Sequence, residues 1–136
     1  MTIAAEIICV GTELLLGDIL NSNAQFLARE LANLGITHFY QTVVGDNPSR
    51  IKLVVAQACE RSQLLLFTGG LGPTPDDLTL ETLADFFAVP LVEHPEILAD
   101  IATKFSQRGR EMPPSNRKQA LLPVTAEVLQ IGRAHG

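Results

Sequence analysis

The feature that most constrains the fold is the alternation of short strand patterns with helical patterns, which occurs three times along the chain. Apolar, β-branched or aromatic residues dominate Glu6–Val10, Ile36–Val44 and Leu64–Thr68. Each run is followed by a segment in which apolar residues recur at helical spacing. The alternation predicts an α/β domain with a mostly parallel sheet and right-handed crossovers, and its first and third strands read as buried on both faces.

Helical spacing also predicts the segments that cover this sheet. After the N-cap residues Asn21 to Asn23, a helix carries Phe26, Leu27, Leu31 and Leu34 on its apolar face and closes at Gly35. The other predicted segments are a helix from Pro48 with Ile51, Val54, Val55 and Ala58 on its apolar face, a helix over Thr79–Phe87, a short extended piece over Val89–Val92 and a helix over Pro95–Gln107.

The composition excludes several classes of protein. The chain has 136 residues, 46% of them apolar, which suits one domain with its own core and is too apolar for a disordered chain. No apolar run reaches the roughly 18 residues that cross a bilayer, and the start of the chain lacks the pattern of a signal peptide. Cys9 and Cys59 have no metal or redox spacing, so we expect both to be reduced core residues of a cytoplasmic protein. The net charge of −5 argues against a general nucleic-acid-binding protein.

The charge is unevenly distributed along the chain. Residues 1–103 hold four basic and thirteen acidic residues, whereas residues 104–136 hold six basic and two acidic ones. The basic cluster is the solvated end of a helix, a patch that contacts an anion, or a partner for acidic groups of this chain or of a neighbouring subunit. Arginines bind phosphates and amides suit a ribose, so the candidates here are Lys104, Arg108, Arg110, Asn116, Arg117 and Lys118.

Ligands of open α/β sheets bind at the carboxyl ends of the strands, near a switch in strand order. The loops that follow the predicted strands, Gly11–Glu13, Gly45–Asn47 and Gly69–Asp77, are therefore the candidate site. The first loop offers the Thr12 hydroxyl and the Glu13 carboxylate. Either Glu13 takes part in the site or it is a solvated loop residue.

The third loop carries the strongest local signal. Gly69, Gly70 and Gly72 allow close approach of a ligand to the backbone, and the helix that follows begins near the end of the loop. Asp76 and Asp77 suit a Mg²⁺ ion shared with phosphate oxygens, although one of them could simply cap the helix. The loop is neither a Walker A loop nor a dinucleotide fingerprint, because the residues that define those motifs are missing.

Four carboxylates are predicted on one rim of the sheet. They are Glu13, Asp46, Asp76 and Asp77. Asp46 has an alternative role as the cap of the next helix, through the N–H of Ser49 or Arg50. Gathered carboxylates cost stability unless they bind a metal or cations, so the group as a whole indicates a site for a divalent metal.

Several blocks of the sequence resemble the N-terminal part of the competence/damage-inducible protein family, CinA. The Thr68–Thr79 block is the most specific of them, and the match runs from about residue 5 to residue 123. The other matching blocks are Val10–Ile19, Asn21–Ala24, Gln41–Asn47 and Arg108–Ala120.

This resemblance implies a fold like that of MoaB and MogA, a three-layer α/β/α sandwich that binds molybdopterin. In that wider group a Thr-Gly-Gly loop ending in Asp binds the phosphate region of the pterin, which here implies Thr68 to Asp77. A second functional Asp of the group matches Asp46. CinA-type domains are linked to metal-dependent ADP-ribose pyrophosphatase activity, so the resemblance implies hydrolysis of a small anionic nucleotide with Mg²⁺ or a similar ion.

The chemistry of these residues and the family resemblance together predict a role for each candidate site residue. We expect Asp77, Asp46 and Glu13 to be catalytic and Asp76 and Asp77 to bind metal. We expect substrate to be bound by Thr12, Thr68, Gly69, Gly70, Gly72, Arg110, Asn116, Arg117 and Lys118. The alternatives are a module that binds molybdopterin or a nucleotide without chemistry, and an inert truncated relative.

The expected organisation is a single CinA N-terminal domain over residues 1–136 in a homo-oligomer, a dimer or a trimer. Leu14 to Leu16 suit packing or a subunit contact. The family domain continues through another Gly/Pro-rich loop, whereas this chain stops at Ile131–Gly136. We therefore expect a domain shortened at its C-terminal end and without the deamidase domain that CinA proteins often carry.

Overall fold

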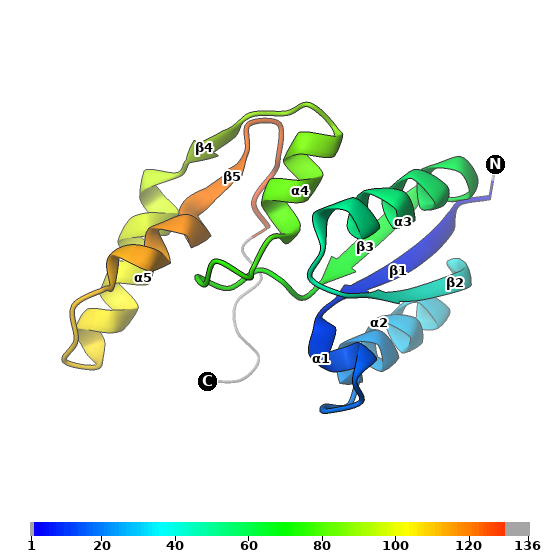
Figure 1. The fold of residues 1–136 in the computed structure, drawn as a ribbon, viewed down its shortest axis with the longest axis horizontal. Helices are drawn as coiled ribbons and strands as arrows, with labels where there is room; N and C mark the ends of the chain where they lie inside the picture. Colours follow the sequence, from blue (N-terminus) through cyan, green and yellow to red (C-terminus); the bar gives the residue numbers. More distant parts are fainter. Residues whose placement is uncertain (1, 130–136) are drawn as a thin grey trace.

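The computed structural model describes residues 2–129, and within them the predicted strands and helices are present. A four-residue helix, a 3₁₀ helix and a fifth strand are additional elements that the sequence pattern did not predict. Figure 1 shows the arrangement. In chain order the elements are β1 (Ala4–Val10), α1 (Thr12–Leu15), α2 (Ser22–Asn33), β2 (Thr37–Val44), α3 (Pro48–Arg61), β3 (Leu64–Thr68), α4 (Thr79–Phe86), β4 (Leu91–Glu93), α5 (Pro95–Gln107), η1 (Pro114–Ala120) and β5 (Leu121–Pro123).

The main sheet has the strand order β2-β1-β3, and both pairings are parallel. The central strand β1 pairs Ile8 with Thr42 of β2 on one side and with Phe67 of β3 on the other. The chain moves from β1 to β2 on one side and then crosses to β3 on the opposite side. The strand order therefore switches at the carboxyl ends of β1 and β3, which is where ligands of such sheets bind.

Helices cover both faces of this sheet, which makes the three-layer α/β/α arrangement that the family resemblance implies (Figure 1). Successive residues of β1 point to opposite faces and are buried on both, because each face has a helix packed on it. On one face Ile8 and Val10 pack with Ile51 and Val55 of α3. The residues that form the core on the other face are Ala5, Ile7, Cys9, Ala24 and Leu31.

The described chain from β4 onward forms a smaller unit beside the main sheet, whereas Leu83 and Phe86 of α4 pack against the core of that sheet. The strands β4 and β5 pair antiparallel, with Leu91 opposite Pro123 and Glu93 opposite Leu121. In Figure 1 this pair lies with α5 and the 3₁₀ helix η1 at one end of the molecule, and β2 lies at the other end. No helix in residues 2–129 combines the length and the apolar character that crossing a membrane requires.

The structure corrects some sequence-based expectations about burial. The strand β3 is half-buried rather than fully buried, since it is an edge strand of the main sheet. On α2 the buried stripe follows Ala24 and Leu31, so Phe26 and Leu34 lie outside it and are 62% and 72% exposed. Cys9 is buried as predicted. Cys59, predicted to be a core residue, is exposed because it lies one residue beyond the buried face of α3. The predicted shortened end at 131–136 lies outside the described residues.

Candidate functional site

A cavity of about 160 Å³ lies at the point where the strand order switches. Its wall includes Val10 at the end of β1, and Thr68 and Gly69 at the end of β3. The remaining wall comes from α1, the turn after it and the start of α2. Those residues are Glu13, Leu14, Ile19, Leu20, Asn21, Ser22 and Asn23. The ends of the first and third strands, both named by the sequence analysis, therefore share one cavity.

The polar side of the cavity is built by the first turn of α2. The Asn21 side chain caps the helix by accepting a hydrogen bond from the Ala24 N–H at 3.4 Å. Asn23 Nδ2 donates to Thr68 Oγ1 at 3.0 Å, which ties α2 to the end of β3. The sequence predicts Asn21 to Asn23 as helix caps and as part of a family block, and their place in the cavity wall is a finding of the structure. The available signal was the run of three consecutive amide and hydroxyl side chains.

Glu13 is the carboxylate that lines this cavity. Its side chain folds back over Gly11, where an added Cβ would lie 2.6 Å from Glu13 Oε1. The glycine therefore leaves room for the carboxylate above the end of β1. Of the two alternatives for Glu13, its position in the cavity wall favours a part in the site.

The glycines of the third loop pack against protein atoms. Gly69 has φ of 90°, and an added Cβ would lie 2.0 Å from the carbonyl oxygen of Val10. Gly70 has φ of 65°, and its Cβ would lie 2.1 Å from Thr79 Oγ1. From the sequence, these glycines are expected to allow close approach of a ligand to the backbone. Internal packing requires glycine at both positions, and Gly69 also lines the cavity at the switch point.

Thr79, at the start of α4, holds the first part of the loop. It is fully buried, its Oγ1 donates to the carbonyl of Gly69 at 2.7 Å, and its N–H donates to the carbonyl of Gly70 at 3.2 Å. These bonds satisfy the two carbonyls and keep the loop against β1. This role could not be predicted from the sequence, because no local motif indicates that Thr79 bonds a carbonyl ten residues earlier in the chain.

Asp77 shapes the second part of the loop. Its Oδ2 accepts hydrogen bonds from the hydroxyl of Thr74 at 2.7 Å and from the N–H of Thr74 at 3.0 Å. The Thr74 hydroxyl is the main cause that lowers the pKa of Asp77, with help from the backbone of Thr74 and Gly72 and from Lys118. Since α4 begins at the N-cap Leu78 without a side-chain cap, the alternative that Asp76 or Asp77 caps it is wrong.

The basic segment pairs with groups of its own chain. Lys118 Nζ donates to the carbonyl of Thr74 at 2.7 Å and to that of Asp77, and it pairs with Glu81 Oε1 at 3.2 Å. Arg117 donates twice to Glu93, at 2.8 and 3.0 Å. Lys104, a third member of the cluster, pairs with Asp100 Oδ2 at 2.9 Å. Of the three alternatives for the basic cluster, these contacts favour pairing with acidic groups of the same chain for three of its members.

Two other predicted substrate-binding residues also lie away from the cavity wall. Asn116 donates from Nδ2 to Gln119 Oε1 at 2.9 Å, within η1. Arg110 is exposed beyond the end of α5. Neither residue lines the cavity at the switch point.

Thr12 and Asp46 join the first two loops to each other. The Thr12 N–H donates to Asp46 Oδ2 at 3.3 Å, and the Asp46 N–H donates to Thr12 Oγ1 at 3.1 Å. The cap of α3 is Asn47, whose side chain accepts from the Arg50 N–H at 3.0 Å. The alternative role of Asp46 as that cap is therefore wrong.

The predicted rim of four carboxylates does not assemble into one metal site. Within residues 2–129 no group of three or more His, Cys, Asp or Glu side chains is placed to hold a metal ion. Glu13 faces the cavity, Asp46 bonds Thr12, Asp77 bonds Thr74, and Asp76 is exposed. The side chains therefore do not fit a resident divalent ion bound by protein ligands alone.

Comparisons with known proteins agree with this architecture. Residues 6–135 match the family model described as "Probable molybdopterin binding domain". A CinA-like protein of Acaryochloris marina is 72% identical over 138 residues, covering 100% of this chain and 33% of that protein. A CinA-like protein of a Cyanothece species is 74% identical over 129 residues, covering 95% of this chain and 31% of that protein. The chain thus spans about a third of the length of the curated relatives it matches.

Solved structures with this fold lead to the same family. The crystal structure of CinA from Thermoplasma acidophilum is 34% identical with a TM-score of 0.81, covering 91% of this chain and 72% of that one. MoaB from Thermus thermophilus is 22% identical with a TM-score of 0.61, covering 90% of this chain and 75% of that one, and shares the fold. This chain therefore belongs to the molybdopterin-binding domain family, and its sequence places it with the CinA-like members.

Proposed function

We propose that the chain binds a small phosphorylated nucleotide in the cavity at the switch point and hydrolyses its pyrophosphate bond, with ADP-ribose as the substrate. The observation that carries this proposal is the wall of the cavity, where Asn21 to Asn23, Thr68 and Gly69 line the same space as one carboxylate, Glu13. A volume of about 160 Å³ is below the roughly 300–1,000 Å³ of cavities that enclose whole small-molecule ligands. It suits the diphosphate of a nucleotide whose remaining groups lie outside.

The groups in the wall suit an anion beside a reactive water. The first turn of the 12-residue helix α2 carries the positive end of the helix dipole and N–H groups, both of which favour phosphate oxygens. Glu13 then accepts a proton from a water molecule whose oxygen attacks one phosphorus. The P–O–P bond breaks as the new P–O bond forms, and the products are AMP and ribose 5-phosphate.

The divalent ion in this proposal arrives with the substrate. Mg²⁺ is commonly held by one or two carboxylates together with substrate phosphates, and it neutralises phosphate charge. Glu13 is the carboxylate in the cavity wall, which suits a magnesium complex of ADP-ribose better than a resident ion. In this proposal Asp46 and Asp77 hold the loops in shape through their hydrogen bonds, and the exposed Asp76 contributes only its charge.

Replacing Glu13 by glutamine is expected to lower kcat for ADP-ribose by about 10²–10⁴-fold, the usual contribution of a general base. The amide keeps the size of the side chain but cannot take the proton. Release of AMP in the presence of Mg²⁺ measures the rate, and Glu30→Gln, on the exposed side of α2, is the control. A folded wild-type chain without turnover, or a Glu13→Gln variant at the wild-type rate, contradicts the proposal.

Binding without chemistry is the second candidate. The observation in its favour is that Asp46 and Asp77, two of the residues expected to be catalytic, make hydrogen bonds within the loops. Calorimetry with molybdopterin and with ADP-ribose separates the candidates, because tight binding of either without release of AMP supports a binding module. An inert chain would bind neither, and neither ligand would raise its Tm by mass action.

We further propose that the chain forms homo-oligomers through the surface around α1 and the turn before α2. Four apolar side chains in this short stretch are exposed, Leu16 at 69% and Leu20 at 91%, together with Leu15 and Ile19. Exposed apolar side chains that gather on one surface mark interaction sites. Leu16→Asp is expected to shift the mass measured by light scattering from a dimer or trimer toward the monomer. Leu53→Asp on α3, where Leu53 is 65% exposed, is the control that should keep the wild-type mass. A wild-type chain that is monomeric at micromolar concentration contradicts this proposal.

A further inference from the structure

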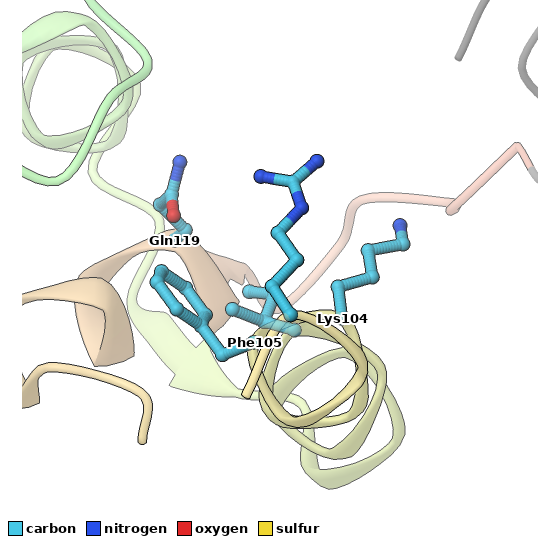
Figure 2. Close-up of a pocket in the computed structure, with 5 residues that line it drawn as sticks. Lys104, Phe105 and Gln119 are labelled. Atoms are coloured by element: carbon cyan, nitrogen blue, oxygen red, sulfur yellow. The ribbon is translucent and has the colours of Figure 1, made fainter. Parts of the chain in front are cut away.

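A second cavity, of about 230 Å³, lies between α5 and η1. Figure 2 shows the side chains that line it. They are Ile101, Lys104, Phe105, Arg108 and Gln119. None of them lines the cavity at the switch point, so this is a separate place on the molecule.

The polar groups of this cavity are hydrogen-bond donors. Lys104 and Arg108 have donors only, and the Oε1 of Gln119 already accepts from Asn116 at 2.9 Å, which leaves its amide nitrogen as a donor. In Figure 2 the Lys104 ammonium and the Gln119 amide nitrogen extend to the same side of the cavity. A ligand that contacts these groups must therefore offer acceptors, and two cations favour an anion.

One acidic group, Asp100, pairs with one of these cations. Lys104 Nζ pairs with Asp100 Oδ2 at 2.9 Å, four residues earlier on α5. Both side chains are about half exposed, and exposed pairs of this spacing are weak and screened by salt. For Arg108 no hydrogen bond or ion pair of the guanidinium is present within residues 2–129. An anionic ligand can therefore engage both cations.

The rest of the cavity wall is apolar. Ile101 and Phe105 lie on the same face of α5 and are half-buried. In Figure 2 the Phe105 ring lies beside Gln119, on the side of the cavity away from Lys104. An aromatic face beside cations suits a planar ring that carries a negatively charged group.

We propose that the cavity between α5 and η1 binds a nucleoside monophosphate, with its phosphate on Lys104 and Arg108 and its ring system against Phe105. The volume of about 230 Å³ is also below the roughly 300–1,000 Å³ of cavities that enclose whole small-molecule ligands, so part of the nucleotide lies outside the cavity. The position of Lys104 in the last turn of α5 is also explained by the helix dipole alone. That explanation does not account for an aromatic ring and an oriented amide around the same cavity. The proposal does not depend on the hydrolysis of ADP-ribose.

The test is a titration of the chain with AMP, followed by NMR of the Gln119 side-chain amide and by calorimetry. AMP is expected to shift the Gln119 resonance, ribose 5-phosphate and inorganic phosphate to bind progressively more weakly, and adenosine to leave the resonance unmoved. Arg108→Gln is expected to weaken AMP binding at least tenfold, whereas Arg50→Gln, an exposed arginine on α3, is expected to leave it unchanged. Phe105→Leu should weaken AMP binding and leave phosphate binding as it was.

Several results would overturn the proposal. One is that the Lys104→Gln/Arg108→Gln double variant binds AMP like the wild type. Another is that adenosine binds as tightly as AMP, and a third is that AMP moves the Asn23 resonances and not those of Gln119. The variant Glu13→Gln should keep AMP binding here even when it has lost hydrolysis, so failure of the proposed reaction and failure of this site can be told apart.

Discussion

Replacing Gly69 by alanine is expected to lower the free energy of unfolding by roughly 3–5 kcal/mol, combining the cost of a strained backbone with that of a forced displacement. The φ of Gly69 is 90°, and an added Cβ would lie 2.0 Å from the carbonyl oxygen of Val10. The obstacle is the backbone of the central strand, which cannot move without disturbing both neighbouring strands. The loop must therefore leave its place between β1 and Thr79.

The matched control is Gly35→Ala. Gly35 has φ of 72°, but an added Cβ would have no heavy atom within 4 Å. Gly35→Ala should therefore lower the free energy of unfolding only by the cost of placing alanine at a positive φ, roughly 1–2 kcal/mol. Urea denaturation of the two variants beside the wild type measures the difference. Equal losses at Gly35 and Gly69 would mean that the contact with Val10 does not hold the loop.

The sequence predicts most of the framework of this fold because its periodic patterns are local. The apolar run of β1 and the spacing of Ile51, Val55 and Ala58 on α3 report burial directly, and the structure confirms them. The position of the candidate site also follows from local signals, since strand ends can be located from the runs themselves. The burial of a single residue is harder to predict from the sequence, as the exposed Cys59 shows. A shift of one residue along a helix is enough to move a side chain from the buried face to solvent.

The roles of individual site residues could not be predicted in the same way. Lys118 acts on carbonyls of Thr74 and Asp77, more than forty residues earlier in the chain, and nothing in the local sequence indicates this. A motif shows that Asp77 belongs to the loop, but not that its carboxylate turns inward to Thr74. Whether a carboxylate faces a cavity or its own backbone depends on loop geometry that only tertiary contacts define.

The second large effect is expected at Glu6, a charged residue buried in the central strand β1. Its side chain is 0% exposed. Arg61 donates to both carboxylate oxygens at 2.9 Å, and the Ser62 hydroxyl donates to Oε1 at 2.7 Å. The guanidinium of Arg61 also lies 3.5 Å from the centroid of the Tyr40 ring. The carboxylate thus joins the end of α3 to the sheet.

Glu6→Ala is expected to lower the free energy of unfolding by roughly 2–4 kcal/mol, through the lost hydrogen bonds and the space left in the core. Arg61 is 37% exposed in its side chain and can turn to solvent, but Ser62 is buried and loses its acceptor. Glu60→Ala, at an exposed position of α3, should change stability by no more than about 0.5 kcal/mol. A loss at Glu6 no larger than that at Glu60 would contradict this role.

The Glu6 carboxylate should also make the free energy of unfolding depend on pH in the acidic range. Hydrogen bonds from Arg61, aided by Ser62 and by the charges of Arg61 and His38, outweigh burial and lower the pKa of Glu6 in the folded protein. A carboxylate whose pKa is lower in the folded state stabilises that state fully at a pH above its pKa in the unfolded chain, about 4.3. This stabilisation is lost as the pH falls through the pKa of the folded state. The free energy of unfolding of the wild type should therefore exceed that of Glu6→Gln at neutral pH, and this difference should shrink as the pH falls below about 4. Urea denaturation across this range measures the difference, and a constant difference would mean that the ionised carboxylate does not carry the stabilisation.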